Sequence, residues 1–152
     1  MPQGFFHVMN EDGPGKLQSV EFFKGKQVVL FAVPGAFTPG CSKKHLPGFI
    51  AQAWKIRDKG IDTIACLSVN DVYVMTAWAE ASGAGDTVQM LADGSAEYTR
   101  LLGLELDSSR FGMGIRSRRY AMIIEDGIVR ELFVDPPGKI EMSTAENVLA
   151  HL

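Results

Sequence analysis

Residues 27–42 read QVVLFAVPGAFTPGCS, and this stretch decides the fold. Its first part, from Gln27 to Val33, is an almost unbroken run of β-branched and aromatic residues. Such a run is typical of a strand that is buried on both faces of a sheet. We therefore predict a central strand over residues 27–33.

A helix is predicted to begin directly after the loop that follows this strand. Thr38 is in position to cap the helix, and Pro39 suits its first position, where no backbone N–H is needed. Cys41 then falls at the third helical position. We expect Pro47 to kink the helix. The expected apolar face of the helix consists of Phe49, Ile50, Ala53 and Trp54, and Lys59-Gly60 ends it.

The remaining chain alternates between short apolar runs and turn signals. The predicted elements are a strand over 62–69, a helix capped by Asn70 or Asp71, a strand over 88–91, a helix over 96–102, a hairpin of 120–125 and 128–134 across Asp126-Gly127, and a helix over 144–151. Parallel units followed by an antiparallel hairpin predict an α/β, thioredoxin-like fold with a mixed central sheet and helices on both faces. No linker-like stretch divides residues 1–152, so we expect a single domain.

Composition excludes several classes of protein. Of the 152 residues, 46% are hydrophobic and 22% are charged, which is typical of a globular protein, and the net charge of -3 favours neither nucleic acid nor an anionic membrane. The longest apolar run, over residues 28–37, is too short to cross a bilayer. Since the first residues form no basic leader and only two cysteines are present, we expect a reducing, cytoplasmic location.

Cys41 is the candidate nucleophile. A thiolate is the reactive form of cysteine, and the first turn of a helix stabilises an anion through free backbone N–H groups. Thr38 can donate to a bound oxygen, and we expect Lys43, Lys44 and His45 to add positive charge. The alternative interpretation is that Cys41 is simply a small buried hydrophobic residue.

Other chemistries find less support in the sequence. Cys66 lies in an apolar run and is interpreted as a buried structural thiol. A disulfide reductase would need a C-x-x-C pair, but Cys41 is followed by Ser42-Lys43-Lys44. The histidines have no metal-ligand spacing with each other or with the cysteines, so we expect neither a metal nor a cofactor.

The segments FAVPGAFTPGCS at 31–42 and HLPGF at 45–49 resemble the peroxiredoxin 5 subfamily, which includes the plant type II peroxiredoxins. The segments 66–71 and 118–122 are similar to later motifs of the same family. The resemblance implies a thiol peroxidase in which Cys41 attacks hydrogen peroxide or an organic hydroperoxide and becomes a sulfenic acid. It also assigns Pro34, Thr38 and Arg119 to the active site, while Arg116 and Arg118 are interpreted as solvated.

The resemblance leaves the recycling of the sulfenic acid open. Animal members carry a resolving cysteine in a segment where this chain has Met142, so that route is not expected. Plant members carry a second cysteine where Cys66 stands, which would allow a disulfide after local unfolding. The favoured route is direct reduction in trans by glutathione, glutaredoxin or thioredoxin.

The resemblance also implies a homodimer and a departure at the beginning of the chain. The dimer surface would lie near the active-site loop, with Phe37, His45, Phe49 and Trp78 as candidates, although Phe49 and Trp78 also suit a core. The family's customary opening strand motif is lacking, which puts the edge of the sheet in doubt but not the site. The competing function is a non-catalytic redox sensor or interaction protein in which Cys41 is oxidised.

Overall fold

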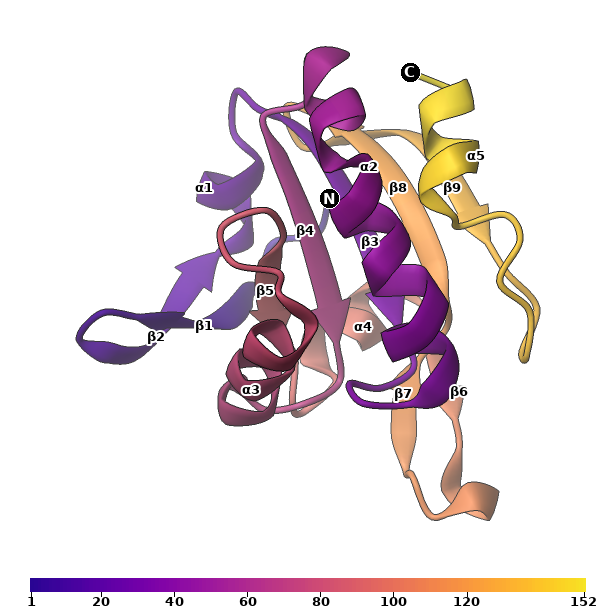
Figure 1. The fold of residues 1–152 in the computed structure, drawn as a ribbon. Coiled ribbons are helices and arrows are strands. Elements are labelled where there is room, and N and C mark those ends of the chain that lie inside the picture. The colour runs from indigo at the N-terminus through magenta and orange to yellow at the C-terminus, as the bar shows by residue number, and fades with distance from the viewer.

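A computed structural model describes the chain over residues 1–152. Seven strands form one mixed sheet in the order β2-β1-β5-β4-β3-β8-β9 (Figure 1). Their bounds are β1 Phe5–Asn10, β2 Gly13–Gln18, β3 Gln27–Val33, β4 Thr63–Ser68, β5 Gln89–Ala92, β8 Tyr120–Glu125 and β9 Ile128–Val134. Two short strands, β6 (Glu105–Asp107) and β7 (Ile115–Ser117), form a separate small sheet.

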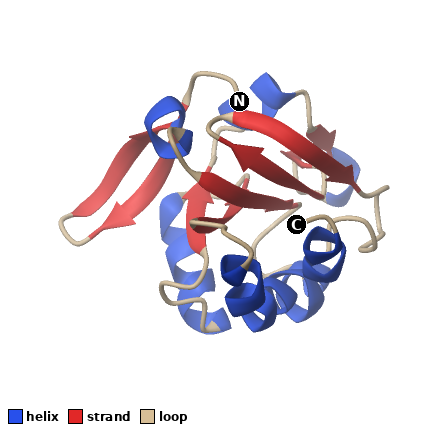
Figure 2. Cartoon of the chain, turned by 90° about the horizontal axis from the view of Figure 1, so that it is seen from above, coloured by secondary structure: helices blue, strands red, loops and turns tan.

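Helices cover both faces of the large sheet (Figure 2), as predicted. They are α1 Ser19–Phe23, α2 Leu46–Asp58, α3 Val72–Ser82, α4 Glu97–Leu102 and α5 Ala145–Ala150, together with a π turn, η1, over Cys41–His45 and a 3₁₀ turn, η2, over Ser109–Phe111. Helices α2, α3 and α5 pack on one face, whereas α1 and α4 pack on the other. None of these helices combines the length and the apolar character that a bilayer crossing requires.

Strand β3 is buried on both sides, which explains its nearly continuous apolar sequence. It pairs in parallel with β4 and antiparallel with β8. Alternate side chains enter two different cores: Val29, Phe31 and Val33 face α2, and Val28, Leu30 and Ala32 face α1 and α4. The predicted central strand is confirmed with the same bounds.

Two local signals are also confirmed. Asp126 and Gly127 both have positive φ, at 47° and 77°, which the tight turn between β8 and β9 requires. Asp71 caps α3, since its carboxylate accepts a hydrogen bond from the Val74 N–H at 2.9 Å. The turn and the cap therefore place the ends of β8, β9 and α3 close to the predicted positions.

The sheet edge, which the missing opening motif had put in doubt, is formed by β1 and β2. Strands β1 and β2 form an antiparallel hairpin that projects from the body of the molecule (Figure 1), and β1 joins β5. The sequence of β2, GPGKLQ, contains Gly13, Pro14 and Gly15, which suit only an edge strand. With this composition, β2 shows no strand periodicity. Helix α1, with five residues, and strands β6 and β7, with three residues each, were missed because they are too short to show a period.

The predicted apolar face of α2 needs one correction. Trp54 does not pack in the core, because 68% of its surface is exposed. The helix instead buries residues at a spacing of three or four, which is the period of one helical face. These residues are Leu46, Phe49, Ala53 and Ile56.

Candidate active site

Cys41 lies where a helix begins after strand β3, at the third helical position, as predicted. The turn that it starts is π rather than α, because the Leu46 N–H donates to the Cys41 carbonyl five residues earlier. Pro47 has no N–H with which to bond the Lys43 carbonyl, so the ordinary ladder is already broken here. The irregularity expected from Pro47 therefore takes the form of this wider turn.

Arg119 reaches the sulfur of Cys41. Its Nη2 donates to Cys41 Sγ at 3.2 Å. Arg119 directly precedes β8, and β8 pairs with β3 so that Tyr120 lies opposite Ala32. This register brings Arg119 to the end of β3, beside the loop that leads to Cys41. Because the guanidinium is permanently charged, the sulfur of Cys41 receives a charge-assisted hydrogen bond.

His45 holds the other side of the same guanidinium. Arg119 Nη1 lies 2.8 Å from His45 Nδ1, and His45 Nε2 lies 2.9 Å from the Ser143 carbonyl oxygen. Because a carbonyl oxygen only accepts, Nε2 carries the hydrogen and Nδ1 accepts from the arginine. Burial lowers the pKa of His45 to about 4; the Ser143 bond raises it and Arg119 lowers it further. His45 is thus neutral, and the expectation that it adds positive charge was wrong.

Thr38 does not cap the helix with its side chain. Its hydroxyl donates to the Gly35 carbonyl at 2.7 Å, while its own carbonyl accepts from the Ser42 N–H at 2.9 Å. The hydroxyl hydrogen is used inside the loop, as is common for threonine in turns. Phe37, in the same loop, has a φ of 64°, which is rare for a residue with a side chain.

A cavity of about 450 Å³ is lined by Gly40, which precedes the buried Cys41, and by Arg119, which contacts its sulfur. Its wall includes the predicted residues Pro34, Thr38 and Arg119. The rest of the wall is largely apolar and comes from the small sheet and from the loop after β9: Leu106, Phe111, Met113, Pro136, Pro137 and Ile140 are among its residues. Pro34 and Thr38, from the loop before Cys41, thus meet Arg119, from a distant part of the sequence, at one hollow, and Arg119 also contacts the sulfur.

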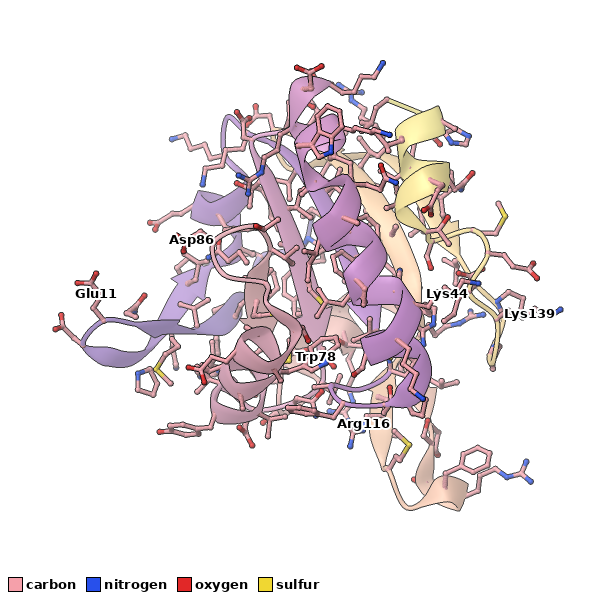
Figure 3. All side chains as sticks on the ribbon, in the orientation of Figure 1. Glu11, Lys44, Trp78, Asp86, Arg116 and Lys139 are labelled. Carbon is pink, nitrogen blue, oxygen red and sulfur yellow. The ribbon has the colours of Figure 1, made fainter.

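Arg116 and Arg118, the two arginines near Arg119 in the sequence, differ in their hydrogen bonding. Arg116 was expected to be solvated, but its Nε donates to the Met113 carbonyl at 2.8 Å and its Nη1 to the Val69 carbonyl at 3.1 Å. Figure 3 shows Arg116 at the end of the molecule where α2 begins. Arg118 lines the cavity, and its side chain makes no hydrogen bond or ion pair with the protein.

Cys66 sits in the middle of β4, opposite Phe31 of β3 and Met90 of β5. It has no exposed surface, which agrees with its interpretation as a buried thiol. Burial raises the pKa of Cys66 well above its usual value, and Cys41 adds to the rise while Arg119 opposes it. Both cysteines are free thiols here.

The candidate aromatic surface is not present. Phe49 is fully buried and stacks on Phe31 with ring centroids 4.0 Å apart. Trp78, labelled in Figure 3, is buried too, and its Nε1 donates to Ser42 Oγ at 2.9 Å. His45 is likewise buried, so only Phe37 is exposed. The alternative prediction, that Phe49 and Trp78 fill the core, is correct.

Sequence reasoning missed Asp135 and Ser143. The carboxylate of Asp135 accepts from the backbone N–H groups of Glu141, Met142 and Ser143 and from the Ser143 hydroxyl. Desolvation raises the pKa of Asp135, but these hydrogen bonds outweigh it and lower the pKa overall. No local pattern signals that this loop reaches His45, which lies 98 residues earlier.

Comparison with known proteins gives a consistent result. The family model described as Redoxin matches residues 6–149. Peroxiredoxin-2E-2, chloroplastic, from Oryza sativa subsp. japonica is 51% identical over 144 residues, which cover 91% of this chain and 64% of that protein. Peroxiredoxin-2B from Arabidopsis thaliana is 45% identical over 153 residues, with 100% of this chain and 94% of the relative covered. The chain thus spans less than two thirds of the chloroplastic relative.

A solved structure agrees closely with the fold. The crystal structure of reduced Prx3 in complex with H2O2 from Vibrio vulnificus has a TM-score of 0.95 and 50% sequence identity, with 99% of this chain and 94% of that chain covered. The predicted thioredoxin-like α/β fold is confirmed at this level of similarity.

Proposed function

Because the chain belongs to the Redoxin family as a type II, peroxiredoxin-5-like peroxiredoxin, we propose that it reduces hydroperoxides with Cys41 as the attacking residue. Peroxiredoxins are thiol peroxidases, and the residues around Cys41 suit that chemistry. The observation that carries the proposal is the contact of the Arg119 guanidinium with Cys41 Sγ at 3.2 Å. This contact supplies the charge that a reactive thiolate needs.

The proposed reaction is an in-line displacement on the peroxide. The Cys41 thiolate attacks one peroxide oxygen; the S–O bond forms while the O–O bond breaks. Sulfur loses two electrons and becomes a sulfenic acid, and the departing oxygen takes up a proton and leaves as water or an alcohol. Arg119 is suited to stabilise the charge that shifts along the O–O bond, since its donors are already oriented. Thr38 and Pro34 would bound the site and exclude water.

The cavity supports both small and organic peroxides as substrates. The Vibrio vulnificus relative is described as a complex with H2O2. The cavity of about 450 Å³ is far larger than that molecule, whose volume is on the order of that of one or two waters. Its apolar wall, with Leu106, Phe111 and Ile140, is suited to an alkyl group. We therefore propose organic hydroperoxides as substrates alongside hydrogen peroxide.

We propose that the sulfenic acid is reduced in trans by glutathione, glutaredoxin or thioredoxin. Cys66 lies inside the sheet, and strand β4 would have to open before its sulfur could meet Cys41. This burial favours the route that uses only Cys41, and no cofactor is needed for it. The homodimer and the single-domain organisation stay predictions. The cytoplasmic location also stays a prediction, and one relative carries a chloroplastic name.

The test compares the two cysteines. Reduced wild type, Cys41→Ser and Cys66→Ser are each mixed with one equivalent of hydrogen peroxide or cumene hydroperoxide, and peroxide loss and intact mass are followed. We expect Cys41→Ser alone to lose rapid peroxide consumption. Equally slow consumption by all three proteins would contradict the proposal.

Mass spectrometry of the wild type separates the recycling routes. A trapped sulfenic acid in both the wild type and Cys66→Ser supports reduction in trans. Loss of two hydrogens in the wild type, with a sulfenic acid only in Cys66→Ser, would instead assign the resolving role to Cys66.

A further inference from the structure

We propose that His45 is a positioning residue, which holds the Arg119 guanidinium on the sulfur of Cys41 and is itself oriented by the Ser143 carbonyl. This inference rests on the proposed peroxidase function. On this inference, a neutral imidazole and a loop more than ninety residues further along the chain set the position of the positive charge at the reacting sulfur.

The guanidinium has two fixed contacts through its two terminal nitrogens. Nη2 donates to Cys41 Sγ at 3.2 Å and Nη1 lies 2.8 Å from His45 Nδ1. The side chain of Arg119 makes no other hydrogen bond in the structure and no ion pair. Since the group is planar and rigid, the bond at Nη1 sets the direction of Nη2. Without His45, the long arginine side chain would keep only its bond to the sulfur.

His45 is itself held on every side. The residue is 2% exposed, and its ring lies against Phe31 and Phe49, at centroid distances of 5.1 Å and 5.6 Å. The Nε2–H bond to the Ser143 carbonyl fixes the tautomer, and that tautomer leaves the Nδ1 lone pair free to accept from Arg119. The imidazole therefore acts as a rigid acceptor of fixed position.

Asp135 closes a ring of contacts that returns to Arg119. Its carboxylate Oδ2 accepts from both the N–H and the hydroxyl of Ser143, at 3.1 Å and 2.6 Å, which anchors the residue whose carbonyl holds His45. The backbone N–H of Asp135 donates to the Arg119 carbonyl at 2.9 Å. The backbone of Arg119 thus supports the loop that orients its own side chain through His45.

Two substitutions separate positioning from packing. In His45→Asn, the amide oxygen can occupy the place of Nδ1 and accept from Arg119. In His45→Gln, the amide can instead replace Nε2 and bond Ser143. We expect Gln to lower the rate constant of Cys41 oxidation by hydrogen peroxide about tenfold to a hundredfold, the range for a misplaced catalytic group. The rate constant of His45→Asn should lie at least halfway, on a logarithmic scale, from that of His45→Gln to that of the wild type. His151→Gln, at an exposed site, serves as the matched control and should react like the wild type.

A double-mutant cycle tests whether His45 acts through Arg119. In an Arg119→Met background, His45→Gln should change the rate constant less than twofold, because no guanidinium remains to be positioned. Equal losses with and without Arg119, or Gln reacting as fast as the wild type, would overturn the inference. If either His45 variant fails to fold, nitrogen NMR of the wild-type imidazole decides: Nε2–H with unprotonated Nδ1 supports the inference, and Nδ1–H overturns it.

The same experiments distinguish failure of the positioning role of His45 from failure of the peroxidase function. If the wild type itself shows no rapid oxidation that depends on Cys41, the peroxidase function fails. If the wild type reacts rapidly but the His45 variants and the cycle give the overturning results, only the positioning role fails.

Discussion

The two cysteines occupy the same hydrophobic core, yet their surroundings differ in one decisive respect. Cys41 and Cys66 are both without exposed surface and belong to one cluster between the sheet and helix α2. Cys41 starts a helical turn and receives a hydrogen bond from Arg119, whereas Cys66 sits in the middle of strand β4. Burial therefore does not distinguish the two thiols. The directed, charged donor at Cys41 and the cavity beside that donor do.

Alkylation should show the largest difference between the two thiols. We expect iodoacetamide to modify Cys41 of the native protein about a thousandfold faster than Cys66, because Cys66 reacts only when β4 opens. Peptide mapping after timed quenching measures both rates in one sample. Comparable rates in the native protein, together with equal rates in urea, would show that the two environments do not differ.

Removal of the Arg119 guanidinium should abolish most of the reactivity of Cys41. Arg119→Met is expected to lower the rate constant of peroxide reduction about a hundredfold to a thousandfold, as for the loss of one preorganised donor at a site of developing charge. Stopped-flow measurement of Cys41 oxidation checks this, with Arg100→Met, at an exposed position of α4, as a control. A loss below about threefold would mean that Arg119 is not part of the machinery.

The comparison also shows what the sequence could reveal. The strand over Gln27–Val33 and the position of Cys41 follow from local patterns: a continuous apolar run, then Thr38-Pro39 at a helix start. The hairpin turn at Asp126-Gly127 is equally local. Arg119 was identified only through a family resemblance, because no local pattern distinguishes it from the neighbouring arginines.

The contacts that hold Arg119 could not be predicted, since they are long-range. His45 appeared to be one of three basic residues after Cys41, but the fold buries it against the Ser143 carbonyl and leaves it neutral. The error at Trp54 was the opposite one: this aromatic residue of a helix was expected in the core but lies outside it. Both errors concern the position of one helix relative to its neighbours, which periodicity alone does not fix.

The surroundings of Cys41 and those of Cys66 should lower the free energy of unfolding at opposite ends of the pH range. Near Cys41, His45 has a folded-state pKa of about 4, below its unfolded value of 6.5, so the unfolded state binds more protons between these values. The free energy of unfolding should therefore fall by about 3 kcal/mol as pH drops from 6.5 to 4. Near Cys66, the folded-state pKa is raised, so stability is present below pH 9 and is lost as pH rises beyond it.

Urea unfolding at a series of pH values measures both effects. His45→Asn should flatten the acid side, and Cys66→Ala should reduce the loss that begins near pH 9. An acid limb unchanged by His45→Asn would assign it to other groups, among which Asp135 is expected to act only at lower pH because its pKa is lowered.

The smallest effect should come from replacing each sulfur by oxygen. Cys66→Ser places a hydroxyl inside the sheet among apolar neighbours, and we expect the free energy of unfolding to fall by about 1 to 3 kcal/mol. Cys41→Ser should cost less, by about 1 kcal/mol, because Arg119 Nη2 can donate to the serine oxygen. Urea denaturation at pH 7 measures both values. A larger loss for Cys41→Ser than for Cys66→Ser would show that Arg119 does not compensate the hydroxyl, and that the two sites differ in packing rather than in hydrogen bonding.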